Sequence, residues 1–135
     1  MLKNLFSGRK DTAQQAIFVL TNEESIIQKI VGTLQEAGYQ VQSATSGQVA
    51  MTLLDQPPFP DMLILDFGMP DMNTSEFLGT VRQRFGRSEL PPVLLLASDT
   101  EGEAAANQLQ VEGYLQKPFD NDQLLAHVLE LLDKK

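Results

Sequence analysis

The stretch LILDFGMPD, Leu63 to Asp71, decides the fold and locates the candidate site. An apolar run, Met62 to Leu65, leads directly into the carboxylate of Asp66. Such a short, continuous run is typical of a strand buried on both faces of a parallel sheet. A carboxylate at the end of a buried strand needs a partner or a chemical purpose. Asp66 is therefore either a turn residue before Met69-Pro70 or a nucleophilic or metal-binding carboxylate, and this stretch alone leaves both interpretations open.

Strand-like and helix-like segments alternate on both sides of this stretch. The expected strands are residues 16–20, 39–44, 62–65, 93–96 and 113–116. Apolar residues at helical spacing predict helices between Glu23 and Gly38, from Ser46 to Leu54, from Asn73 to Phe85, from Thr100 to Leu109, and from Asp120 onward. The last helix carries a broad apolar stripe: Leu124, Leu125, Val128, Leu129, Leu131 and Leu132. This alternation predicts an α/β fold with a doubly wound, five-stranded parallel sheet between two helical layers.

The composition limits the classes of function. The chain has 135 residues, of which 42% are hydrophobic, and this suits one compact domain. Its net charge of −8 opposes direct binding to nucleic acid, and the absence of Cys excludes thiolate sites. The sequence contains no membrane-span run and no signal peptide, so we expect a cytoplasmic protein. Asp66-Phe67-Gly68 also occurs in protein kinases, but the chain is too short and lacks their other motifs.

Residues 1–15 differ from the rest because they show no sustained period. We expect a flexible leader here, ahead of a domain spanning residues 16–135. A docking or membrane-surface helix built on Leu2, Leu5 and Phe6 is the less favoured alternative.

The ends of the predicted strands mark the candidate site. Ligand and reaction sites of open parallel sheets lie beyond the carboxyl ends of the strands. This rule selects Thr21-Asn22-Glu23, Asp66-Phe67-Gly68, Ala97-Ser98 and Lys117-Pro118. Lys117 can reach Asp66 in this topology, with Pro118 fixing the loop, as a cis bond would. The alternative for Lys117 is a solvated lysine before a turn.

The order and spacing of these residues resemble the receiver domain of two-component response regulators, over about Ala16 to Leu132. The match rests on Asp66, Met69-Pro70, Asn73 at the start of the next helix and, most specifically, the segment Gly113 to Phe119. The resemblance implies a flavodoxin-like fold. It also implies that Asp66 accepts a phosphoryl group from the phosphohistidine of a sensor kinase and that Lys117 is its charge partner.

The acidic pocket departs from the family pattern. Two acidic residues that help to hold Mg²⁺ in receivers correspond to Thr21 and Asn22, and Glu23 stands one position too late. Mg²⁺ prefers oxygen ligands that include carboxylates, so we expect weak or absent binding through Asp66, Asn22 and Gly68. Asn22 has the alternative role of a helix N-cap. Without the acidic pair, we expect Asp66 to pair with Lys117 with no competing carboxylate.

The switch residues depart as well. The hydroxyl that ends the fourth strand in the family is replaced by Ala97, which has no side-chain donor. Ser98 stands one residue late and is expected to point elsewhere, as a turn serine. The switch aromatic is kept as Tyr114, although packing alone could account for it. Thr74 stands where the family commonly has Gly.

Two functions follow from this pattern. The first is a single-domain response regulator in a phosphorelay, because the chain ends with the last helix, with output through contacts to other proteins. The alternative is a pseudo-receiver that binds partners without phosphorylation, because Thr21, Asn22 and Ala97 replace the metal pair and the switch hydroxyl. The expected partner is a sensor histidine kinase or another signalling protein, and a homodimer through the last two helices is a further option.

Enzymatic catalysis is a third class, and we expect none. The first strand-end loop, residues 20–24, has no glycine that would let backbone approach a phosphate. His127 is expected on the partly exposed flank of the last helix, with no phosphoryl-carrier role.

Overall fold

The computed structural model describes residues 15–56, 59–69, 72–98 without 86–89, and 101–133. Its centre is a parallel sheet with strand order β2-β1-β3-β4-β5. The strands are β1 (Ala16–Leu20), β2 (Gln40–Ala44), β3 (Met62–Asp66), β4 (Val93–Ala97) and β5 (Gly113–Gln116). The helices are α2 (Glu24–Glu36), α3 (Gly47–Leu54), α4 (Thr74–Phe85), α5 (Glu101–Leu109) and α6 (Asn121–Asp133).

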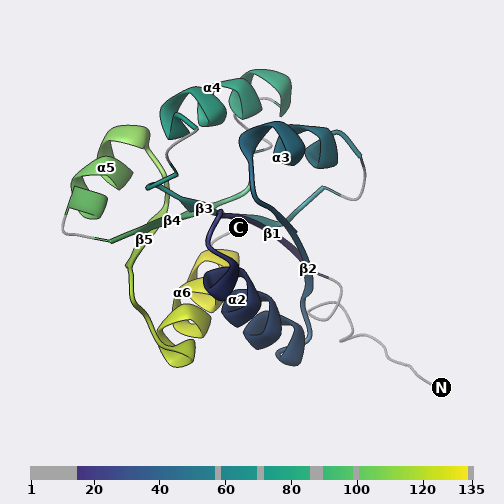
Figure 1. The fold of residues 1–135 in the computed structure, drawn as a ribbon, viewed down its shortest axis with the longest axis vertical. Helices are drawn as coiled ribbons and strands as arrows, with labels where there is room; N and C mark the ends of the chain where they lie inside the picture. The colour runs from purple at the N-terminus through teal and green to yellow at the C-terminus, as the bar shows by residue number, and fades with distance from the viewer. Residues whose placement is uncertain (1–14, 57–58, 70–71, 86–89, 99–100, 134–135) are drawn as a thin grey trace.

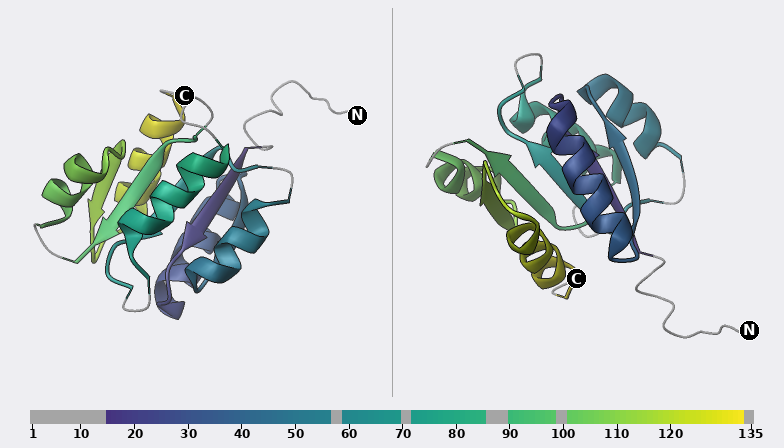
Figure 2. Two further views of the ribbon diagram at one scale, coloured as in Figure 1. Left: turned by 90° about the horizontal axis from the view of Figure 1, so that it is seen from above. Right: turned by 60° about the horizontal axis from the view of Figure 1, so that its bottom comes forward.

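The helices form two layers around the sheet. Helices α2 and α6 lie side by side on one face, and α3, α4 and α5 cover the other (Figure 1). The two further views show the same three layers (Figure 2). The predicted doubly wound α/β/α architecture is therefore confirmed.

Each face of the sheet has its own core, because successive strand residues point to opposite sides. In β3, Ile64 belongs to the core under α2 and α6, whereas Leu65 belongs to the core under the other three helices. All five residues of β3 and of β4 are buried. Continuous apolar strands therefore lie at the centre of the sheet, and β2, with mostly polar residues, lies at its edge.

Polar side chains cap the starts of α3, α4 and α6. The hydroxyl of Ser46 accepts the Val49 N–H at 3.2 Å, and the side chain of Asn73 accepts the Glu76 N–H at 3.0 Å. Asp120 is a cap residue just outside α6, since its carboxylate accepts the Gln123 N–H at 2.8 Å. These bonds satisfy amide groups that have no partner within the helix.

Some expected boundaries and faces differ. Tyr39 is buried but precedes β2, while Asp66 and Ala97 are the last residues of β3 and β4. Leu129 was predicted in the apolar stripe of α6 but is 57% exposed. The buried positions of α6 are Leu124, Val128, Leu131 and Leu132, which form one narrower face, so Leu129 lies beyond its edge. Residues 1–14 of the leader and Thr100 lie outside the described residues.

Candidate functional site

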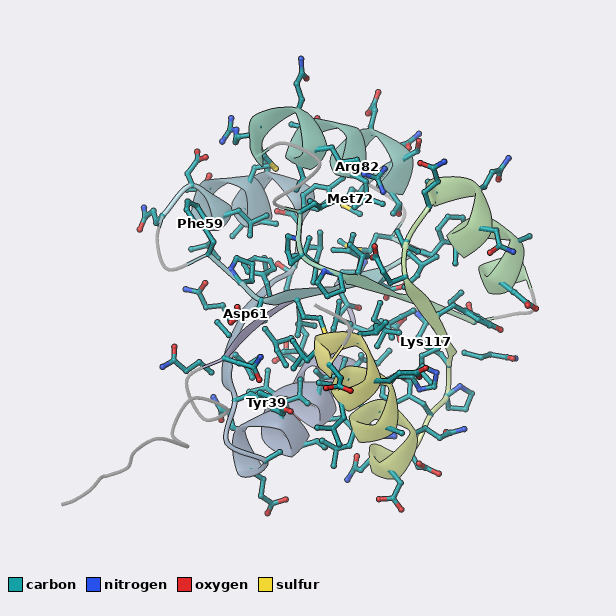
Figure 3. The ribbon with its side chains drawn as sticks, turned by 180° about the vertical axis from the view of Figure 1, so that it is seen from behind. Tyr39, Phe59, Asp61, Met72, Arg82 and Lys117 are labelled. Carbon is teal, nitrogen blue, oxygen red and sulfur yellow. The ribbon has the colours of Figure 1, made fainter. Side chains whose placement is uncertain are left out.

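The carboxyl ends of strands β1, β3 and β5 lie at the same edge of the sheet and bring three chemical groups together, although β4 stands between β3 and β5. Thr21 follows β1, Asp66 ends β3, and Lys117 follows β5. The backbone N–H of Lys117 donates to the carbonyl of Ala97 at 2.7 Å, which fixes the start of the loop after β5. The Lys117–Pro118 bond is cis. Figure 3 shows Lys117 where β5 leads toward α6.

Asp66 is the centre of this site. It is 1% exposed, and both of its carboxylate oxygens accept hydrogen bonds. Oδ1 accepts the Gly68 N–H at 3.0 Å and the Lys117 ammonium at 3.0 Å. Oδ2 accepts the Thr21 hydroxyl at 2.6 Å and the Lys117 ammonium at 3.1 Å. Hydrogen bonds and an opposite charge of this kind offset the free-energy cost of burying a carboxylate. The expected contact between Asp66 and Lys117 is thus present.

Thr21 is a residue of this site whose contact with Asp66 the sequence did not reveal. Its side chain is fully buried, and its hydroxyl accepts the Glu23 N–H at 3.3 Å while donating to Asp66. A threonine in place of an acidic residue indicated only a lost metal ligand. The position of Thr21 directly after β1 could have indicated this bond. The strands β1 and β3 are neighbours, so the residues at their carboxyl ends lie close together at one edge of the sheet.

Glu23 corrects the expectation that Asp66 faces no competing carboxylate. Its Oε2 lies 2.7 Å from the Lys117 ammonium, closer than either oxygen of Asp66. The Glu23 side chain is 50% exposed, whereas that of Lys117 is 10% exposed. The lysine therefore pairs with a buried carboxylate on one side and a half-exposed one on the other.

The two carboxylates stabilise the charged form of Lys117. Burial by itself lowers the pKa of a lysine ammonium. The hydrogen bonds to Glu23 and Asp66, together with their negative charges, outweigh this effect and raise the pKa of Lys117 above its usual value. The ammonium is therefore a permanent cation in the physiological range.

The side chains around Asp66 do not fit a magnesium site. Mg²⁺ requires near-octahedral oxygen ligands, whereas here an ammonium, an N–H and a hydroxyl proton point at the two oxygens of Asp66. The position of Lys117, close to both oxygens, would repel a divalent cation. Among the described residues, no three acidic, His or Cys side chains gather as a metal-binding group.

Asn22 does not take the structural role expected for it. The N-cap position of α2 belongs to Glu23, which makes no capping bond with its side chain. Asn22 is exposed beside it. The cap prediction for Asn22 was therefore wrong, because the helix begins one residue later than the position that Asn22 could cap.

The end of β4 is apolar and closely packed. Ala97 is 2% exposed, and a Cβ built on Gly102 would lie 2.6 Å from the Ala97 Cβ and 2.6 Å from Cδ1 of Tyr114. The backbone of α5 therefore approaches both residues as closely as only glycine allows. The hydroxyl of Tyr114 donates to Gln116 Oε1 at 3.3 Å, within β5 itself. Ser98 is exposed, as expected of a turn serine.

A hollow of about 580 Å³ opens beside Lys117. Its lining includes Glu23, Lys29, Ser98, Lys117 and Phe119. Lys29, from α2, donates to the carbonyl of Phe119 and lies 4.9 Å from the centre of its ring. Sequence reasoning missed Lys29, which ties α2 to the loop that carries Lys117.

Two further residues complete the comparison with the sequence. His127 is partly exposed on α6, with Nδ1 2.8 Å from the Gln123 carbonyl, as expected for the flank of the helix. The Thr74 hydroxyl is buried and has no hydrogen-bond partner among the described residues.

The described helices include none that is long and apolar enough to cross a bilayer.

Comparison with known proteins identifies the family. The sequence model of one protein family, the response regulator receiver domain, matches residues 17–129 of this chain. A relative is the transcriptional regulatory protein KdpE of Mycobacterium tuberculosis, 33% identical over 113 residues, which are 83% of this chain and 48% of the relative. The transcriptional regulatory protein BasR of Escherichia coli is 29% identical over 117 residues, 86% of this chain and 51% of the relative. The chain thus spans about half the length of these curated relatives.

Solved structures agree with this match. The chemotaxis response regulator CheY4 of Vibrio cholerae has a TM-score of 0.78 at 30% identity, covering 87% of this chain and 98% of its own. A putative response regulator from Chloroflexus aurantiacus has a TM-score of 0.79 at 25% identity, covering 89% and 98%. The chain belongs to the response regulator receiver domain family.

Proposed function

Because the chain is a receiver domain of two-component signalling, we propose that Asp66 is its phosphoacceptor and Lys117 the charge partner of the acceptor. One observation carries this proposal: the Lys117 ammonium lies 3.0 and 3.1 Å from the two oxygens of a buried carboxylate at the carboxyl edge of the sheet. A fixed cation at this place stabilises negative charge that develops on a transferred phosphoryl group.

The proposed step is a phosphoryl transfer with no redox change. A carboxylate oxygen of Asp66 forms a bond to phosphorus while the bond from phosphorus to the donor nitrogen of a phosphohistidine breaks. The electron pair of that bond stays on the imidazole nitrogen, and no proton is needed from Asp66. Enzymatic phosphoryl transfer depends on positioning and charge neutralisation, so a site that relies on one ammonium should react slowly.

The proposed partners are signalling proteins: a sensor histidine kinase as donor and another protein as receiver of the output. The supporting facts are the family membership and the hollow beside Lys117, where a donor group can approach. A homodimer through α5 and α6 is a second option, supported by the exposed Leu129 on α6. The proposal includes a cytoplasmic location, no nucleic-acid contact and no metabolic reaction.

A second function is favoured by a specific observation. Both oxygens of Asp66 already accept hydrogen bonds from Thr21, Gly68 and Lys117. This saturated carboxylate suits a receiver that binds its partners without phosphate. In that case the polar cluster would hold the loops of one binding-competent conformation.

Intact-mass measurement separates the two functions. The protein is exposed to acetyl phosphate with and without Mg²⁺, beside Asp66→Asn. The phosphoacceptor proposal predicts the mass of one phosphoryl group, lost in Asp66→Asn and present in both metal conditions. The absence of any mass gain would leave the phosphate-independent function.

A further inference from the structure

Glu23 occupies one side of the cation that the proposed reaction needs. An ammonium has three N–H donors, and the structure gives the Lys117 ammonium three carboxylate oxygens as acceptors. These are Oδ1 and Oδ2 of Asp66 and Oε2 of Glu23. The donors of Lys117 are therefore fully used before any phosphoryl group arrives.

The bond to Glu23 is the one that an incoming group can displace. Asp66 is 1% exposed and is also held by Thr21 and Gly68, so its bonds to Lys117 are difficult to replace. The Glu23 side chain is half exposed and lines the hollow beside Lys117, so water can solvate it after release. Solvated ion pairs are weak compared with buried ones.

A phosphoryl group on Asp66 would compete with Glu23 in two ways. It brings about two negative charges and three acceptor oxygens, which are drawn to the same ammonium. Its charge also repels the Glu23 carboxylate, which shares that ammonium. The contact between Glu23 and Lys117 thus stabilises the site before transfer more than after it.

We propose that Glu23 restrains phosphoryl transfer to Asp66 by occupying the donor of Lys117 that the phosphoryl group requires. This inference rests on the proposed function of Asp66. Glu23 acts through Lys117 as a positioning residue, and its release sets the rate at which the acceptor reacts.

The test compares Glu23→Gln with Glu24→Gln. Both variants remove one negative charge from the same end of α2, but Glu24 is exposed and is not among the carboxylates that bind Lys117. Glu23→Gln removes no capping hydrogen bond from α2, because the Glu23 side chain makes none. Mass gain from acetyl phosphate is followed over time in both variants and in the wild type, with and without Mg²⁺. We expect Glu23→Gln to react about fivefold faster, equivalent to about 1 kcal/mol, and Glu24→Gln to change the rate less than twofold.

A second readout reports on Lys117 directly. Titration of the lysine ammonium groups by NMR should show a lower pKa for Lys117 in Glu23→Gln and no change in Glu24→Gln. A purely structural ion pair would give the same titration result but leave the rate of mass gain unchanged, so the inference requires both the lower pKa of Lys117 and the faster reaction in Glu23→Gln.

The possible outcomes separate the role of Glu23 from the acceptor function of Asp66. Equal rates in the wild type and Glu23→Gln, with mass gain at Asp66 in both, would remove the role of Glu23 and leave the acceptor function intact. A slower reaction of Glu23→Gln in Mg²⁺ would indicate that Glu23 is a metal ligand. Mass gain in Glu23→Gln alone, abolished by adding Asp66→Asn, would support the inference most strongly. No gain in any variant would overturn both the acceptor function and this inference.

Discussion

Two regions at the same edge of the sheet differ in chemistry. The Asp66 cluster, made of Thr21, Glu23, Asp66, Gly68 and Lys117, is a connected set of charged and polar groups. The Ala97 cluster, made of Ala97, Gly102 and Tyr114, is packed through carbon atoms. The first region provides the proposed acceptor, and the second contains Ala97, which the sequence analysis predicts at the position of the family's switch hydroxyl.

The contrast shows which physical constraint acts on each region. A buried carboxylate must keep its charge partner, so Asp66 and Lys117 depend on each other. Among the described residues, no buried charge lies at the end of β4, and Ala97 packs closely against Gly102 there. We therefore infer that this chain keeps the acceptor end of a receiver while the end that would respond to phosphate is closed. The following predictions test each region in turn.

The largest effect is expected from breaking the Asp66 cluster at its cation. Lys117→Met leaves the Asp66 carboxylate buried without its charge partner, and we expect the free energy of unfolding to fall by about 3–5 kcal/mol. Urea unfolding measures the loss. The matched control adds Asp66→Asn, which removes both charges and should recover most of the stability. A loss below about 1 kcal/mol in Lys117→Met would show that the pair is not a structural unit.

Thr21→Val tests the buried hydroxyl with a side chain of similar shape. It removes the 2.6 Å bond to Asp66, and we expect a loss of about 2 kcal/mol, typical of a hydrogen bond to a charged group. Thr21→Ser keeps the hydroxyl and should lose less. As a control, Thr52→Val removes an exposed hydroxyl on α3 and should change stability little. Equal losses in Thr21→Val and Thr21→Ser would assign the effect to packing.

Gly102→Ala tests the close packing of the Ala97 cluster. The new Cβ would meet Ala97 and Tyr114 at separations that require movement, and we expect a loss of about 1–2 kcal/mol. Gly79→Ala is the control, because Gly79 lies in α4 with open space around its Cβ position and should gain helix stability. If Gly102→Ala were as stable as Gly79→Ala, the region would be more open than the account requires.

A smaller effect is expected from alkaline pH. Lys117 binds its proton more tightly in the folded chain than in the unfolded one, so its stabilisation is complete below the ordinary lysine pKa of about 10.4 and is lost as pH rises through the folded value. Burial raises the pKa of Tyr39 as well, and this acts in the same direction. Urea unfolding of Tyr39→Phe between pH 8 and pH 11 measures the pH dependence of the free energy of unfolding without the contribution of Tyr39. An unchanged or rising stability in that range would contradict the ion pair.

Much of this fold follows from sequence, but the site follows only in part. The apolar runs that end at Leu20 and Leu65 predicted central strands, because continuous apolar runs fit only a sheet covered on both faces. The pairing of Asp66 with Lys117 followed from topology and from the family resemblance. The contacts of Thr21 and Glu23 could not be predicted in this way. A hydrogen bond depends on the direction of a side chain and on distances shorter than the spacing between neighbouring residues, and a sequence pattern does not give either.

The contrast between the two clusters is tested most directly by amide NMR with beryllofluoride, a mimic of the phosphoryl group. Residue-resolved shifts are compared in the wild type and in Asp66→Asn. The account predicts Asp66-dependent shifts at Gly68 and Lys117, with little change at Gly102 and Tyr114. Shifts of equal size at Gly102 and Tyr114 would contradict it, because they would show that the end of β4 still responds to the acceptor.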